Sequence, residues 1–161
     1  MNATIVLFSF AVVIFVAAFI TKRRFGLLGL GLAAGSILSV IWAYDIGLEA
    51  SLFGAPSGPI TKAIVSCLLI LFPAVILLFH GDKYKSMAGR VIGAILFTLL
   101  AVGFLIEPLS HAVSSQGFGS EVFNWILDNR NTIIGAGLTI AIIDLILTKP
   151  AHFPSKHHKK H

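Results

Sequence analysis

The sequence predicts an all-α membrane protein, a polytopic bundle of about five transmembrane helices (four clear ones and a weaker fifth) with a short amphipathic helix at the membrane surface. Hydrophobic residues make up 57% of the 161 residues and charged residues only 12%, about half the charge of a typical soluble domain. The apolar residues form uncharged blocks close to the ~20 helical residues that cross a ~30 Å hydrocarbon layer. Basic residues gather in alternate connections between these blocks.

Five apolar blocks are separated by polar or Gly/Pro-rich connections. They cover residues 4–20, 25–44, 63–79, 91–106 and 133–147. Barrel strands would alternate in ~10-residue segments instead, so we expect helices. The connection 21–24 is so short that we expect the first two helices to be antiparallel neighbours, and 45–62 is predicted to be a loop. We expect residues 1–148 to form one transmembrane domain and 149–161 a basic Lys/His tail.

The charges predict the orientation, because cytoplasmic connections of membrane proteins are enriched in Lys and Arg. Ten of the twelve basic residues lie in alternate connections, with Asp82 as the one acid among them: Lys22, Arg23, Arg24, Lys83, Lys85, Arg90, Lys149, Lys156, Lys159 and Lys160. The other connections hold Lys62 and Arg130 against five acids: Asp45, Glu49, Glu107, Glu121 and Asp128. This pattern predicts a multi-pass protein of the cell (inner) membrane, with the N-terminus outside and the C-terminus in the cytoplasm. Basic residues follow the first block, the reverse of a secretory signal, so we expect a retained helix.

The fifth block is the weakest of the predicted crossings, because 15 residues span only ~22 Å and Asp144 interrupts them. Its nine Leu and Ile residues, at ~0.3 to 0.6 kcal/mol each, offset an Asp that costs ~3 kcal/mol at the membrane centre and less near the end. Insertion is therefore marginally favourable. The alternatives are a shallow re-entrant hairpin and a helix that inserts only against its neighbours.

A short amphipathic helix is expected between the fourth and fifth blocks. Ser120 is a suitable N-cap for residues 121–129, where Trp125 belongs to an apolar side opposite Glu121 and Asp128. We expect this helix to lie on the outer membrane surface, at the headgroup level that Trp42 and Tyr44 mark at the end of the second block.

Two pairs of glycines with small-xxx-small spacing are candidate packing sites. Gly31 and Gly35 lie in the second block, and Gly89 and Gly93 at the start of the fourth. Lipid provides no hydrophobic drive between helices, so close backbone approach at such positions supplies the contacts. The pairs predict either packing within this chain or an interface with a partner.

Asp144 is a functional candidate because ionisable groups at membrane depth are costly. Its place near the cytoplasmic end favours an intramembrane ion pair with Arg90 or a carboxylate that reaches headgroup water, and a proton or cation path is the alternative. Pro73 predicts a kink in the third helix. The Glu107-Pro108 step predicts the end of the fourth helix, with Glu107 near Arg130.

The remaining residues predict no chemistry. Cys67 is the only cysteine and is expected to be a small buried hydrophobe, so no disulfide or cysteine zinc site is expected. The tail carries His157, His158 and His161, for which contact with anionic lipid is favoured over a metal site. We expect no catalytic residues, cofactor, metal or nucleic-acid partner. The expected partners are the lipid bilayer and other membrane proteins or further copies of this chain.

The order of features resembles the bacterial colicin V production protein family of small inner-membrane proteins. A first helix leads into a basic turn and a Gly-rich second helix at residues 22–29, and Gly89-Arg90-Val91-Ile92-Gly93-Ala94 looks like the entry to that family's last main helix. An amphipathic Trp-bearing segment follows, so the resemblance covers roughly residues 1–130. It implies a non-enzymatic role in toxin production or secretion and envelope maintenance. The alternatives are a membrane-embedded subunit of a larger secretion or transport complex and a small transporter or channel.

Overall fold

The computed structural model describes residues 3–52, 58–79, 84, 86–112 and 119–147, and every regular element in this part of the chain is a helix. The helices are α1 (Ala3–Thr21), α2 (Phe25–Leu52), α3 (Pro59–Phe79), α4 (Met87–Ala112), α5 (Ser120–Asp128) and α6 (Arg130–Ile146). By length and composition, α1 to α4 are long and apolar enough to cross a membrane. The predicted class, an all-α multi-spanning bundle, is confirmed at this level.

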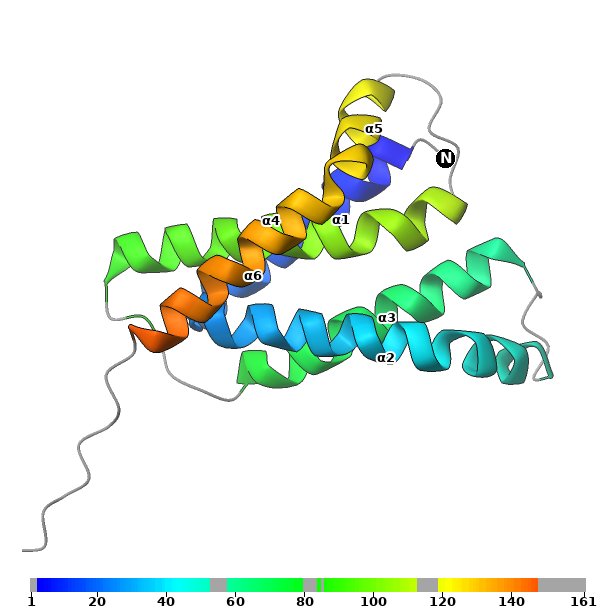
Figure 1. Ribbon diagram of the computed structural model, residues 1–161, viewed down its shortest axis with the longest axis horizontal. Coiled ribbons are helices and arrows are strands. Elements are labelled where there is room, and N and C mark those ends of the chain that lie inside the picture. Colours follow the sequence, from blue (N-terminus) through cyan, green and yellow to red (C-terminus); the bar gives the residue numbers. More distant parts are fainter. Residues whose placement is uncertain (1–2, 53–57, 80–83, 85, 113–118, 148–161) are drawn as a thin grey trace, which may run out of the picture.

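Figure 1 shows α2 and α3 side by side in one half of the bundle, α1 and α4 in the other, and α6 running obliquely across both. The most extensive contact joins α2 to α3, and the next joins α1 to α4. The helices alternate in direction, so that α1 and α3 begin at the end where α2 and α4 finish. One end of the bundle therefore holds the α1–α2 connection, and the opposite end holds α5.

The prediction that α1 and α2 are packed neighbours is wrong, since the described parts of these helices make no contact. The turn between them is attached to α3 instead. Lys22 adopts a left-handed conformation (φ 59°), and the guanidinium of Arg23 donates hydrogen bonds to the carbonyls of Leu78 (3.0 Å) and Phe79 (2.7 Å). Arg23 thus accepts the role of a cap by donating to free carbonyls at the C-terminus of α3. This places α2 against α3 and away from α1.

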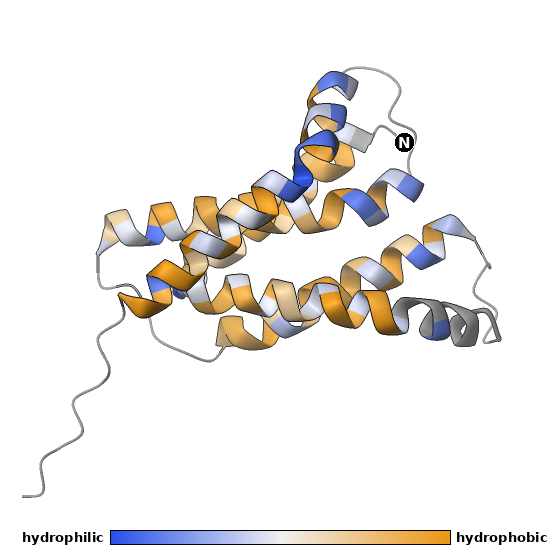
Figure 2. Ribbon diagram, in the orientation of Figure 1, coloured by the Kyte–Doolittle hydropathy of each residue, from blue (hydrophilic) through white to orange (hydrophobic). Residues whose placement is uncertain are grey.

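The surface of the bundle is largely apolar, as insertion into a membrane requires. Among the described residues, the buried side chains are all apolar, while large hydrophobic side chains such as Val40 (86% exposed) and Phe8 (70% exposed) point outward. Hydrophilic residues gather toward the ends of the helices (Figure 2). An apolar belt between two polar ends matches a hydrocarbon layer between two aqueous phases.

Two helices are longer than their sequence blocks. The predicted loop 45–62 is partly helical, because α2 continues to Leu52 through good helix formers and ends before Gly54 and Pro56. The predicted stop at Pro108 is also wrong, since α4 runs through it to Ala112. Leu109, only 8% exposed, packs into the core on the far side of the proline, and this packing keeps the helix continuous despite the missing N–H.

The expected short helix is present as α5, and its first turn differs in detail. The N-cap is Gly119, in a left-handed conformation (φ 83°), and no side chain caps the helix, so Ser120 does not have the predicted role. Phe123 is buried against the bundle, whereas Trp125 is 63% exposed.

Candidate functional site

Asp144 lies at the C-terminal end of α6 and is bound to the start of α2. Its carboxylate accepts a hydrogen bond from the backbone N–H of Gly26 (2.9 Å), within the first turn of α2, where the helix dipole is positive. Gly26 is needed here, because a Cβ would come within 2.6 Å of the Ala141 carbonyl oxygen and 3.0 Å of the carboxylate itself. The missing side chain lets α6 approach α2 closely enough for the carboxylate to cap it.

Tyr84 connects this site to the other helices. Its hydroxyl donates to Asp144 Oδ1 (3.3 Å) and accepts from the N–H of Phe25 (3.2 Å), while its own N–H donates to the carbonyl of Lys22 (2.8 Å). The guanidinium of Arg24 lies 5.8 Å from the ring centroid, within cation–π range. The pKa of the Tyr84 phenol is raised above its ordinary value, and burial is the largest cause. The hydrogen bond from the Phe25 N–H lowers this pKa, and the Asp144 carboxylate raises it further.

The Tyr84 ring packs on the second pair of glycines. A Cβ at Gly89 would lie 3.0 Å from ring atom Cδ1, and one at Gly93 would lie 2.5 Å from Cε2. The absence of side chains at these two glycines therefore lets an aromatic ring of the same chain pack against α4. Tyr84 was not predicted from the sequence to have a role. The signal that marks it is an aromatic residue one to two helical turns before a Gly-xxx-Gly pair.

Arg90 and Asp144, which were predicted to pair, have other partners among the described residues. Arg90 donates to the carbonyl of Phe19 (3.4 Å), and its guanidinium lies 5.0 Å from the Phe19 ring centroid. Gly89 and Asp144 line one small cavity, and the next residue along a helix points about 100° away. Arg90 therefore faces α1, on a different side of α4 from Asp144.

Gly31 and Gly35 are buried between α2 and α3. A Cβ at Gly31 would lie 3.0 Å from the Ala74 Cα, and one at Gly35 would run into the carbonyl oxygen of Ile70. The two helices approach along this line because neither glycine has a side chain. Of the two predicted roles, packing within this chain is therefore the one that Gly31 and Gly35 have. They offer no free surface to a partner.

The opposite end of the bundle carries the predicted interfacial residues. Arg130 and Glu107 form an ion pair (2.8 Å) with side chains 30% and 54% exposed, as expected from the sequence. Trp42 and Trp125 are both exposed. The side chain of Tyr44 and the tail 149–161, with its His residues, lie outside the described part of the structure.

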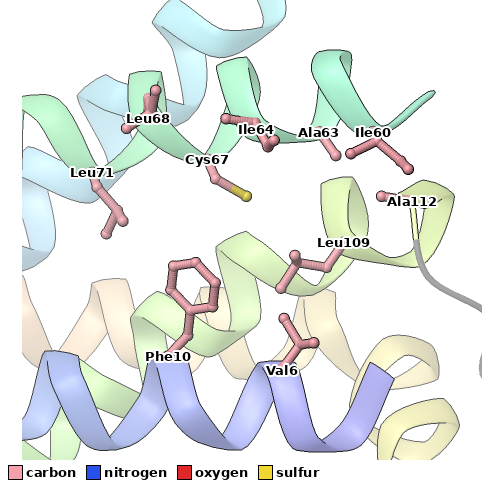
Figure 3. A pocket seen from close by; sticks show the side chains of 10 residues that line it. All are labelled: Val6, Phe10, Ile60, Ala63, Ile64, Cys67, Leu68, Leu71, Leu109 and Ala112. Carbon is pink, nitrogen blue, oxygen red and sulfur yellow. The ribbon is translucent and has the colours of Figure 1, made fainter. Parts of the chain in front are cut away.

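An apolar cavity of about 550 Å³, here called the outer cleft, opens between α1 and α3 at the end of the bundle that carries Glu107 (Figure 3). It is lined by Val6, Phe10, Ile60, Ala63, Ile64, Cys67, Leu68, Leu71, Leu109 and Ala112. Cys67 is buried, as expected, and its sulfur points into the cleft. The sequence gives no local signal for this cleft, because its lining comes from three helices far apart in the chain.

The residues that the structure describes contain no group of three or more His, Cys, Asp or Glu side chains arranged to hold a metal ion. No family model, no curated protein and no solved structure matches the chain. Its function is therefore inferred from the helices and the side chains that they bring together.

Proposed function

We propose that this chain is a five-crossing protein of the bacterial inner membrane that acts by binding other membrane components, with no catalysis or solute transport of its own. Two observations carry the proposal together: the buried side chains of the described residues are all apolar, and an apolar cleft lies between α1 and α3. A binding protein needs surfaces at membrane depth, and the outer cleft is such a surface. A transporter needs a polar path through the core.

The fifth crossing in this proposal is α6. Its 17 residues span about 25 Å. Arg130 at its start pairs with Glu107 near the end of α4, and Asp144 near its end shares a cavity with Gly89 at the start of α4. Since α4 is itself long enough to cross, these contacts support an α6 that extends over most of the same depth.

The orientation follows from the charges at the two ends. Arg23, Arg24 and Arg90 lie at the end where α1 and α3 finish, which the proposal places in the cytoplasm. The opposite end then faces outward, with α5 on the membrane surface and the exposed Trp125 at headgroup level.

Binding is favoured over transport because the ionisable groups lie at the ends of the helices. Asp144, the most central of them, caps α2 and is hydrogen-bonded to Tyr84. Coupled transporters place charged or unwound elements near the midplane instead. The resemblance to colicin V production proteins adds a setting, support of toxin production or secretion and envelope maintenance. The competing setting is a subunit of a larger secretion or transport complex.

The binding proposal is tested by flux measurements on purified protein in liposomes. Proton and monovalent cation fluxes are expected to equal those of empty vesicles. A flux above that level that disappears in Asp144→Asn would refute the proposal and make the chain a transporter.

The topology is tested with a reporter enzyme that is active only outside the cytoplasm. A fusion after Ala112 is expected to be active and a fusion after His161 silent, because α6 returns the chain to the cytoplasm. Activity in both fusions would show that α6 does not cross.

A further inference from the structure

We propose that the outer cleft binds one acyl chain of a phospholipid from the outer leaflet. The inference rests on the proposed function, which places this end of the bundle outward in the membrane. Every side chain that lines the cleft is apolar, so the occupant must be apolar over the whole buried length. The cleft opens beside α1 and α3, where the surrounding hydrocarbon is lipid.

The size of the outer cleft matches one acyl chain. Its lining on α3 runs from Ile60 to Leu71, a length of about 16 Å. An apolar cavity of about 150 Å³ holds one benzene molecule, so the outer cleft has room for roughly 20 carbon atoms. That is the size of one acyl chain.

The shape of the wall supports the same occupant. The buried part of the wall consists of Ala63 and Cys67, one turn apart on α3, and Leu109 of α4. Larger side chains such as Phe10 and Ile64 stand around them (Figure 3). Left empty, these walls would lose dispersion contacts on one side, whereas a flexible acyl chain restores them without moving a helix.

The experiment uses full-length protein in vesicles of phosphatidylglycerol that carries a diazirine in one acyl chain. After irradiation, mass spectrometry maps the labelled residues. Labelling of the cleft segments around Phe10 and Cys67 is expected to exceed that around Leu99 on the lipid-facing side of α4 several-fold. Ile64→Trp, which fills the cleft from an exposed position, should reduce cleft labelling by at least half.

Leu99→Trp is the matched control, because Leu99 and Ile64 are both 55% exposed. It should leave cleft labelling unchanged. Leu68→Trp, at a site 63% exposed, is a second blocking variant should Ile64→Trp fold poorly. Even labelling over all lipid-facing helices, or cleft labelling that both blocking variants leave intact, would overturn the lipid proposal.

The single cysteine tests for a protein occupant. A short bismaleimide should give no Cys67-to-Cys67 cross-link in the membrane; an efficient cross-link would place a second copy at the cleft and overturn the lipid proposal. These outcomes are distinct from failure of the proposed function. Loss of preferential labelling leaves the flux result standing, and a solute flux would refute the binding role without emptying the cleft.

Discussion

The two sides of α3 differ in how closely they pack against the neighbouring helices. On one side α3 is closely packed against α2, where Gly31 and Gly35 lie against its backbone. On the other side it faces α1 across the outer cleft and touches it only slightly. The same helix is thus closely packed against one neighbour and separated from another by a cleft.

Apolarity is therefore enough to place a helix in the membrane, whereas small residues such as Gly31 and Gly35 let it pack closely against a neighbour. α1 is strongly apolar and contains no glycine, so it presents side chains such as Val6 and Phe10 toward α3. In lipid there is no hydrophobic gain from bringing two such surfaces together. α1 is held by α4 instead, and the space beside α3 remains open.

The largest expected effect is on the side of α3 that packs against α2. In Gly35→Ala, one methyl group runs into the carbonyl of Ile70, which belongs to backbone and has little freedom to move. We expect the variant to lose about 3 kcal/mol or more, or to fail to fold, as measured by unfolding in detergent. Gly135→Ala is the control, since a Cβ there meets nothing within 4 Å and helix propensity favours Ala by up to ~1 kcal/mol. Equal stability of the two variants would contradict the close packing of α2 and α3.

The next effect is expected at Asp144, which caps the start of α2. Asp144→Asn keeps the shape of the side chain and removes the charge that caps α2, so a loss of about 1 to 3 kcal/mol is expected. Arg90→Gln should not share this loss through Asp144, because Arg90 contacts Phe19. A double variant whose loss equals the sum of the single losses would confirm that the two residues do not interact. A strong coupling between them would restore the ion pair predicted from the sequence.

The sequence was sufficient for the helices and insufficient for their contacts. The apolar runs predicted the approximate places of α1 to α4 and α6, because insertion into lipid depends on composition, and the amphipathic pattern of residues 121–129 predicted the place of α5. The pairing of helices was not predictable from the spacing of glycines. Gly35 and Gly93 belong to the same spacing motif, yet Gly35 packs against the backbone of α3 and Gly93 against the ring of Tyr84. Tyr84 was missed because its role depends on contacts with residues 22, 25 and 144, which the fold alone brings together.

A smaller effect is expected for Tyr84→Phe, about 0.5 to 1.5 kcal/mol for the lost hydrogen bonds. The pH dependence of the stability difference between wild type and Tyr84→Phe is a more specific test. Because the folded state raises the pKa of Tyr84, the stabilisation by the neutral phenol is complete below the unfolded value of about 10 and is lost as the pH rises through the higher folded value. The gap between wild type and variant should therefore be constant from pH 7 to 9 and close above pH 10. A gap that widens there would show that the phenolate is the stabilising form.

The smallest effect is expected on the open side, at Phe10, which is 37% exposed and lines the outer cleft. In a closed core, Phe→Ala leaves a cavity and costs about 3 to 5 kcal/mol. At the outer cleft, the removed ring leaves space that an acyl chain fills, so Phe10→Ala should cost less than about 1 kcal/mol in lipid vesicles. Phe97→Ala is the matched comparison, because Phe97 is 2% exposed and enclosed by protein, and it should show the full cavity cost. The contrast should shrink in a detergent too bulky to enter the cleft. A full cavity cost for Phe10→Ala in lipid would mean that protein, and not lipid, closes this side of α3.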